Sequence, residues 1–188
     1  MADRAPGLAG GSLAARIDRL ESYGAIRQLA WRYAYALDRR DIDALTALYA
    51  EDVEVGRHHR GRQALVDEMV PALRRVRITI LHVGTHVIDF VDDDHATGGV
   101  YCHAEVQPDE RTWISQAIHY TDRYVRQDGH WYFAARRRHE LFYGVEHGRN
   151  PVGLAPADWP VHDTGAGTLP GRWESWQRFW AQETLPAG

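Results

Sequence analysis

The chain has 188 residues, of which 44% are hydrophobic, so it can build one domain with a sizeable core but not two large ones. The formal net charge of -4 disfavours nucleic acid and anionic membranes as partners, because both normally require a basic surface. No apolar run approaches the ~20 residues needed to cross a bilayer. We therefore expect a soluble, cytoplasmic protein whose partner is a small molecule or another protein.

The N-terminal half is predicted to be helical. Residues 1–12 are rich in alanine and glycine and are expected to form a disordered lead. Apolar residues then recur at three- and four-residue steps, as at Ile26, Leu29, Tyr33 and Leu37, which predicts an amphipathic helix with one buried face. Asp38 stands at the end of that face.

A polar break follows this helix. Asp41 is suited to cap a second, short helix over 42–49, because its side chain can accept hydrogen bonds from the first free amides. Residues 53–55 predict a short strand, and 64–74 predict a third helix.

The second half has the composition of a β-sheet. Strands are predicted over 77–91, 96–106, 112–126 and 130–143, since these segments are rich in β-branched and aromatic residues. The pair Asp128-Gly129 is the strongest hairpin signal in the chain. Helices followed by long antiparallel strands predict an α+β domain, in which one curved sheet carries helices on one face.

The domain is expected to span 13–146, with a tail over 147–188. Trp173, Trp176, Phe179 and Trp180 have helical spacing and predict a short amphipathic helix in that tail. We expect the tail to pack on its own domain or on a neighbouring subunit, with a flap over a pocket mouth as the alternative.

Two histidines in the first long strand are candidates for chemistry. Simple alternation places His82 and His86 on one face, about 13 Å apart, which is too far for a shared metal ion. We expect neither a metal nor a cofactor. A histidine oriented by a carboxylate such as Asp38 would be a suitable general base near neutral pH. The residues alone leave two interpretations open: this proton-transfer pair, or a solvated aspartate and a structural histidine. Cys102, the single cysteine, is expected to pack rather than react.

Four fragments in sequence order carry a resemblance to a known family: WRYAYALDRRDIDALTALYAED, ILHVGTHVIDF, ATGGVYCHAEV and YTDRYVRQDGHWYFAARRR. Together they resemble the SnoaL-like branch of the nuclear-transport-factor-two-like superfamily. Within it the chain is most similar to scytalone dehydratase, bile-acid dehydratase and hexachlorocyclohexane dehydrochlorinase, which eliminate without a cofactor. The resemblance implies a cone-shaped barrel of a curved, mostly antiparallel sheet, with helices on its concave side and one apolar pocket inside.

The resemblance also implies roles for single residues. Asp38 matches the family's carboxylate, His82 its general-base histidine, and Tyr33 a catalytic tyrosine. Tyr35 is the alternative phenol, because three residues on a helix bring it to the face of Asp38. His86 stands where the group often has asparagine, which implies an altered contact with the substrate.

Other positions depart from the bile-acid enzyme. Its additional strand aspartate falls on Ala104 and its late arginine on Glu140, so its substrate cannot be transferred to this chain. His103 and Glu105 flank the missing acid, and Tyr101 shares their face. These three side chains either substitute for the acid or point to solvent.

Further substrate contacts are predicted from aromatic and cationic residues. Arg137 either reaches a polar substrate group or belongs to a solvated arginine run. The predicted apolar pocket lining is Trp31, Tyr49, Ile88, Phe90 and Trp113.

These predictions lead to two hypotheses. The first is a dehydratase for a hydrophobic cyclic hydroxy-ketone such as a polyketide or steroid, assembled as a homodimer or homotrimer, with isomerase or aldol cyclase as alternatives. The second is a non-catalytic ligand-binding member of the superfamily. The first requires the Asp38 carboxylate and the His82 imidazole within ~3.2 Å of each other in a closed apolar cavity.

Overall fold

The computed structural model describes residues 11–56, 58–153 and 168–182, so most of the predicted lead lies outside the described residues. Helix α1 (Leu13–Asp38) is continuous and begins at Ser12, whose Oγ accepts a hydrogen bond from the Ala15 amide at 3.2 Å. Its predicted buried face is confirmed. The apolar residues of that face are Ile26, Leu29, Ala30, Tyr33, Ala34, Ala36 and Leu37.

Short elements connect α1 to the sheet. Asp41 caps α2 (Ile42–Ala47) as predicted, because its Oδ1 accepts a hydrogen bond from the Ala44 amide at 3.1 Å. Strands β1 (Glu54–Val55) and β2 (His59–Arg60) form a small antiparallel pair. Helix α3 (Arg62–Arg74) then leads back to the sheet.

The main sheet has four antiparallel strands in chain order. They are β3 (Ile78–Phe90), β4 (His95–Gln107), β5 (Trp113–Gln127) and β6 (His130–His147). The predicted hairpin is confirmed, since Asp128 and Gly129 both have positive φ angles, 50° and 77°, as a two-residue hairpin turn requires.

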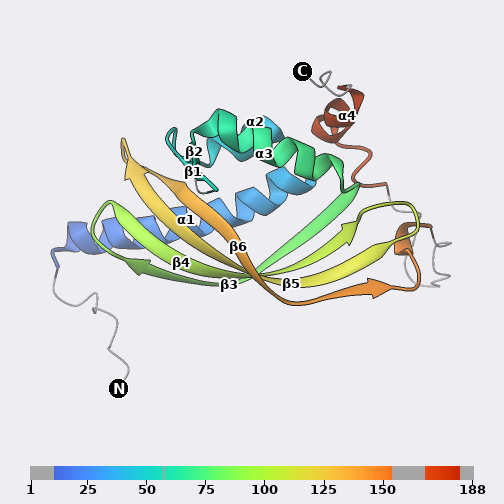
Figure 1. The fold of residues 1–188 in the computed structure, drawn as a ribbon. Coiled ribbons are helices and arrows are strands. Elements are labelled where there is room, and N and C mark those ends of the chain that lie inside the picture. The colour runs from blue at the N-terminus through green and yellow to red at the C-terminus, as the bar shows by residue number, and fades with distance from the viewer. Residues whose placement is uncertain (1–10, 57, 154–167, 183–188) are drawn as a thin grey trace.

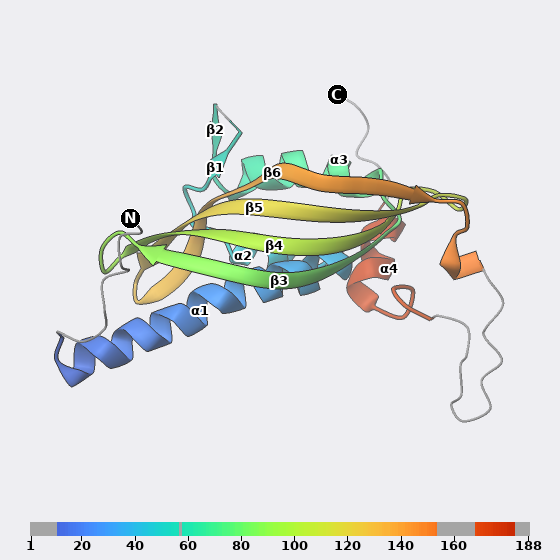
Figure 2. The ribbon, with the colours of Figure 1, turned by 90° about the horizontal axis from the view of Figure 1, so that it is seen from below.

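The sheet is curved, and the helices lie on its concave side (Figure 1). We call this side the inner face and the opposite side, seen in Figure 2, the outer face. The predicted α+β fold with a cone-like curved sheet is therefore confirmed, although the described strands form an open sheet rather than a closed barrel.

A bulge in β3 decides which side chains face inward. Val83 pairs with Cys102, but His86 pairs with Val100, so Gly84 and Thr85 together oppose a single residue. From this point on, the strand residues that face inward are shifted by one position, so His86 faces inward whereas His82 faces outward. The prediction that His82 and His86 share a face is therefore wrong.

Register shifts in β6 have the same effect. Arg123 pairs with Ala135 while Tyr124 pairs with Phe133, and Asp122 then pairs with Arg136. The shift turns Arg136 inward with Phe133. Arg137, for which a substrate contact and a solvated position were both open, is exposed, which fits the solvated position.

Helix α4 (Glu174–Ala181) packs on its own chain. The Ser175 hydroxyl donates to the Arg39 carbonyl at 2.7 Å, and Arg74 donates to the carbonyl of Phe179 at 3.1 Å. Residues 154–167 and 183–188 of the predicted tail lie outside the described residues.

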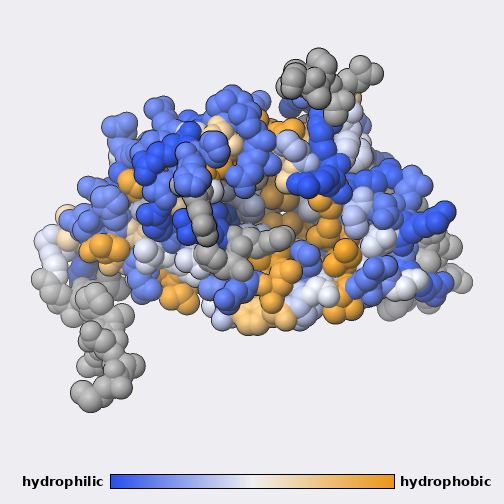
Figure 3. Space-filling view, in the orientation of Figure 1, coloured by the Kyte–Doolittle hydropathy of each residue, from blue (hydrophilic) through white to orange (hydrophobic). Residues whose placement is uncertain are grey.

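Apolar side chains gather in two places on the molecule. Figure 3 shows hydrophobic residues in the recess between the helices and the sheet. A second set of hydrophobic side chains is exposed. The exposed residues include Ile80, Val87, Tyr101, Leu141, Phe142, Tyr143 and Val145. Among the described residues, no helix has the length and apolar character needed to span a membrane.

Candidate active site

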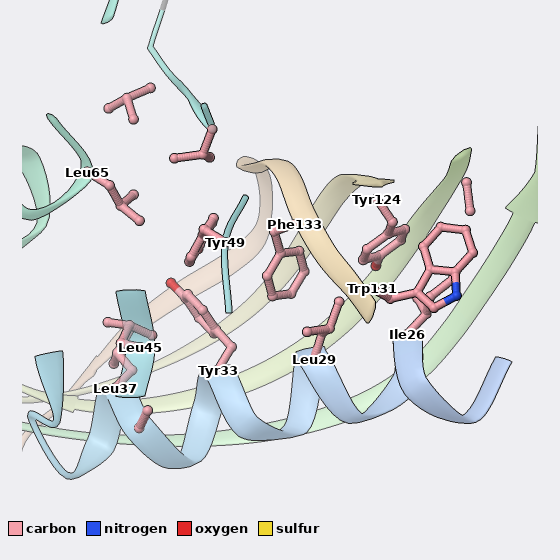
Figure 4. Close-up of a cluster of buried hydrophobic side chains, with 14 of the residues drawn as sticks. Ile26, Leu29, Tyr33, Leu37, Leu45, Tyr49, Leu65, Tyr124, Trp131 and Phe133 are labelled. Atoms are coloured by element: carbon pink, nitrogen blue, oxygen red, sulfur yellow. The ribbon is translucent and has the colours of Figure 1, made fainter. Parts of the chain in front are cut away.

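Aromatic side chains fill the space between α1 and the sheet. Tyr33 rises from α1 towards Tyr49 and Phe133, as Figure 4 shows. The Phe133 ring centre lies 5.1 Å from that of Tyr49 and 5.5 Å from that of Tyr124. These contacts confirm that the predicted residues Tyr33 and Tyr49 belong to the interior, which is apolar except for the groups described next.

A buried ion pair lies among these rings. Arg136 Nη1 is 3.6 Å from Asp122 Oδ2, and the two side chains are 2% and 0% exposed. The guanidinium carbon lies 4.1 Å from the ring centre of Tyr120 and 4.4 Å from that of Tyr33. Such stacking stabilises a cation but leaves its N–H groups available. No nitrogen of Arg136 forms a hydrogen bond to a residue that the structure describes.

Asp122 also anchors a hydrogen-bonded chain that reaches β3. The Tyr124 hydroxyl donates to Asp122 Oδ2 at 2.8 Å, and His86 Nε2 lies 2.9 Å from the same hydroxyl. Burial, together with the charges of Arg136 and Arg27, lowers the pKa of His86 to about 4. The imidazole is therefore neutral at pH 7. His86, predicted as a substrate contact, does face the interior.

Asp38 lies at the end of α1 beside the start of β3. Its carboxylate accepts hydrogen bonds from Thr79 Oγ1 at 2.9 Å and from the Leu81 amide at 3.0 Å. Burial raises the pKa of Asp38 to about 6, although these bonds and the nearby charge of Arg40 oppose the rise. Asp38 is therefore a carboxylate that titrates close to neutral pH.

The predicted pair of Asp38 and His82 does not form. His82 is exposed and pairs on β4 with His103, which is also exposed, whereas its neighbour Leu81 packs against the core. The Asp38 carboxylate accepts hydrogen bonds from Thr79 and Leu81, whereas His82 acts on it only through its charge, which lowers the pKa of Asp38. The prediction is wrong because alternation along β3 turns Leu81, not His82, towards α1.

A cluster of buried apolar side chains connects Asp38 to Arg136, and we call it the inner floor. Leu81 donates its amide to Asp38 at one end, and Tyr120 lies under the Arg136 guanidinium at the other. The inner floor consists of Ala30, Leu81, Val83, Val100, Cys102, Ala104, Val106, Ile118 and Tyr120. Burial raises the pKa of Cys102 to about 11, so its thiol stays protonated and packs, as predicted.

Several predicted contacts lie outside this interior. On α1, Trp31 and Tyr35 are 47% and 64% exposed, because they fall on the face of the helix opposite Tyr33. On β4, Tyr101 and His103 are exposed and lie on the outer face. None of these four side chains reaches the interior. The predicted roles of Trp31 and Tyr35 there are therefore wrong, and for Tyr101 and His103 the alternative holds, that they point to solvent.

Of the remaining residues predicted to line the pocket, two face the interior and one lies elsewhere. Ile88 and Phe90, predicted to line the pocket, face the interior and pack within the core, and neither lines a cavity that the structure describes. Trp113 is buried, but its indole N–H donates to Glu105, and both line a cavity of about 450 Å³ at the end of the sheet rather than the interior. A larger cavity of about 990 Å³ lies between α2, α3 and α4 and includes Arg40 in its lining.

Three interior residues were missed by the sequence reasoning: Asp122, Tyr124 and Arg136. The first two could have been found, because Tyr120, Asp122 and Tyr124 alternate along β5 and place a carboxylate on the same face as two aromatic rings. Arg136 could not be found by alternation, since the register shift in β6 is what turns it inward.

Comparison with known proteins agrees with this architecture. The family model of the SnoaL-like domain matches residues 18–137. Among proteins of curated function, none matches this chain.

Solved structures provide further similarity. The chain is similar to a hexachlorocyclohexane dehydrochlorinase (LinA) of type 2, with 24% identity, coverage of 73% of this chain and 99% of that one, and a TM-score of 0.65, which shows the fold. It is also similar to a proposed scytalone dehydratase from Novosphingobium aromaticivorans, with 29% identity and a TM-score of 0.60. That similarity covers 74% of this chain and 98% of the other one. These findings support an enzyme of this superfamily that converts a small molecule. Because the family model spans well over half of its residues, the chain belongs to the SnoaL-like family of the nuclear-transport-factor-two-like superfamily.

Proposed function

We propose that the protein is a cofactor-independent lyase that removes water from a hydrophobic cyclic hydroxy-ketone, such as a polyketide or steroid. One observation carries the proposal. The guanidinium of Arg136 is buried among aromatic rings, beside Asp122, and has no hydrogen-bond partner among the described residues. A cation held in a dry site stabilises an oxygen on which negative charge develops.

Asp38 is the base in this proposal, in place of His82. A general base works best when its pKa lies near the working pH, and burial brings the pKa of Asp38 to about 6. Asp38 takes a proton from the carbon next to the substrate carbonyl, and the resulting enolate oxygen is held by Arg136 and the phenol of Tyr33. As the enolate reforms the carbonyl, a carbon–carbon double bond forms and the β-hydroxyl leaves with the proton from Asp38, as water.

The inner floor supports this substrate class. It is apolar along its length from the base to the cation, so the substrate that packs against it in this proposal is a hydrophobic ring system. The same enolate gives isomerisation when no leaving group is present and aldol cyclisation when an internal electrophile is present. These outcomes depend on the substrate.

A ligand-binding function without catalysis is the second candidate. One observation favours it: the position beside the Asp38 carboxylate is taken by Leu81, and the imidazole that the family resemblance implied lies on the outer face. A binding protein would keep affinity for the same ligands without converting them.

Product analysis separates these candidates. We would incubate the purified protein with a panel of cyclic hydroxy-ketones and detect the loss of one water by mass spectrometry. Asp38→Asn and Arg136→Met are each expected to lower kcat/KM by about a hundredfold or more. His82→Ala, on the outer face, is the matched control and should keep full activity. Intact turnover in Asp38→Asn, or its loss in His82→Ala, would refute the proposal.

The pH dependence identifies the base. With Asp38 as base, kcat/KM rises with pH through about 6, because the carboxylate must be ionised to accept the proton. If His86 were the base, the rise would occur near pH 4 instead, since its pKa is about 4.

A further inference from the structure

The orientation of protons on His86 follows from its hydrogen-bond partners. The Tyr124 hydroxyl donates its only hydrogen to Asp122 Oδ2, at 2.8 Å. The Tyr124 oxygen can therefore only accept from His86 Nε2, which lies 2.9 Å away. The hydrogen of the neutral imidazole is thus on Nε2, and Nδ1 carries a lone pair.

The charges around this chain hold that arrangement in place. Asp122 is the counter-charge of Arg136, a side chain that does not lose its proton in proteins, and both are fully buried. Burial and the Asp122 carboxylate raise the pKa of Tyr124, so the phenol keeps its hydrogen. In this hydrogen-bonded group of Tyr124, Asp122 and Arg136, no member gives a second proton to His86.

Nδ1 of His86 is buried and has no hydrogen-bond partner among the described residues. A buried acceptor without a partner costs free energy, which a bound donor recovers. His86 lies on the inner face beyond the bulge, on the same side of the sheet as Ile88 and the Tyr124–Asp122–Arg136 group.

We propose that His86 Nδ1 is a substrate-recognition atom that accepts a hydrogen bond from a hydroxyl group on the substrate's ring system. The substrate then presents two polar groups of opposite kind to the interior: an oxygen acceptor to the Arg136 guanidinium and a hydroxyl donor to His86. This inference deepens the proposed function and rests on its placing the substrate on the inner face. A ring that carries a methoxy group, or none, at the donor position is rejected, because it leaves Nδ1 unpaired.

Two substitutions separate the two nitrogens of the imidazole. His86→Gln keeps a donor for Tyr124 near the position of Nε2 but offers nothing at Nδ1. His86→Asn offers an acceptor near the position of Nδ1 and loses the contact with Tyr124. His82→Gln, on the outer face, is the control for an ordinary histidine replacement.

The experiment measures equilibrium binding by calorimetry and needs no turnover. The probes are acetophenone, its three ring-hydroxylated isomers and the matching methoxy compounds. The wild-type protein and His82→Gln should bind at least one hydroxy isomer about tenfold more tightly than acetophenone and its methoxy analogue. His86→Gln should lose this preference, and His86→Asn should retain part of it.

Three results would overturn the inference: no preference for any hydroxy isomer in the wild type, no binding of any probe, or a preference that survives in His86→Gln. If His86→Gln does not fold, Tyr124→Phe gives the test, because removing the oxygen that fixes the tautomer should also weaken the preference. Failure of the proposed function gives a different result: the protein binds hydroxylated probes selectively but forms no product from the cyclic hydroxy-ketones.

Discussion

Removing the charge of Asp122 tests whether the interior is built around a buried ion pair. Asp122→Asn keeps the size of the side chain but leaves the guanidinium of Arg136, whose side chain is 2% exposed, without its counter-charge. Breaking a buried pair on one side typically costs about 3–5 kcal/mol of the free energy of unfolding. For a protein of this size each kcal/mol lowers Tm by about 2–4 °C, so the expected decrease is on the order of 10 °C.

The double variant Asp122→Asn/Arg136→Met provides the control. It removes both charges and keeps an unbranched side chain against the rings of Tyr33 and Tyr120, so most of the lost stability should return. Chemical denaturation and thermal unfolding by circular dichroism measure both variants. A cost below about 1 kcal/mol for Asp122→Asn, or a double variant no more stable than the single one, would refute the reasoning.

The remaining predictions concern other parts of the chain. Burial raises the pKa of Asp38 from 3.8 to about 6, so its contribution to stability is present below pH 3.8 and is lost as pH rises to about 6; Asp38→Asn should gain stability relative to the wild type across this window, and parallel unfolding curves would contradict it. Gly129→Ala should cost about 1 kcal/mol, because φ is 77° at that turn; an unchanged denaturation midpoint would argue against the turn geometry. Cys102, with a pKa of about 11, should resist alkylation at pH 8 until the protein unfolds, which mass spectrometry can follow. We expect the outer face to join copies of this chain into a homodimer or homotrimer, so Tyr101→Lys should shift sedimentation towards the monomer, and an unchanged assembly would contradict this.

Local patterns predicted the helices and turns well. The three- and four-residue spacing from Ile26 to Leu37, the cap at Asp41 and the turn at Asp128-Gly129 each depend on neighbouring residues only, and all three are confirmed. Strand positions were also found to within a few residues, because β-branched composition and turn residues delimit them.

The site could not be predicted as well, because it depends on which face each strand residue occupies. A single bulge between Val83 and His86 reverses the order of faces along β3, and the register shift that turns Arg136 inward does the same in β6. Gly84 was the one local indication of the first bulge, since glycine inside a strand often marks such a position. The role given to His82 came from the family resemblance, and the exposed position of His82, which precedes the bulge, does not support it.

A crystal structure of the protein with a bound cyclic hydroxy-ketone tests the central claim most directly. We predict that the carbonyl oxygen lies within hydrogen-bond distance of the Arg136 guanidinium, with the ring on the inner floor and its acidic carbon facing Asp38. A ligand held in the cavity between α2, α3 and α4, or against His82 on the outer face, would contradict it.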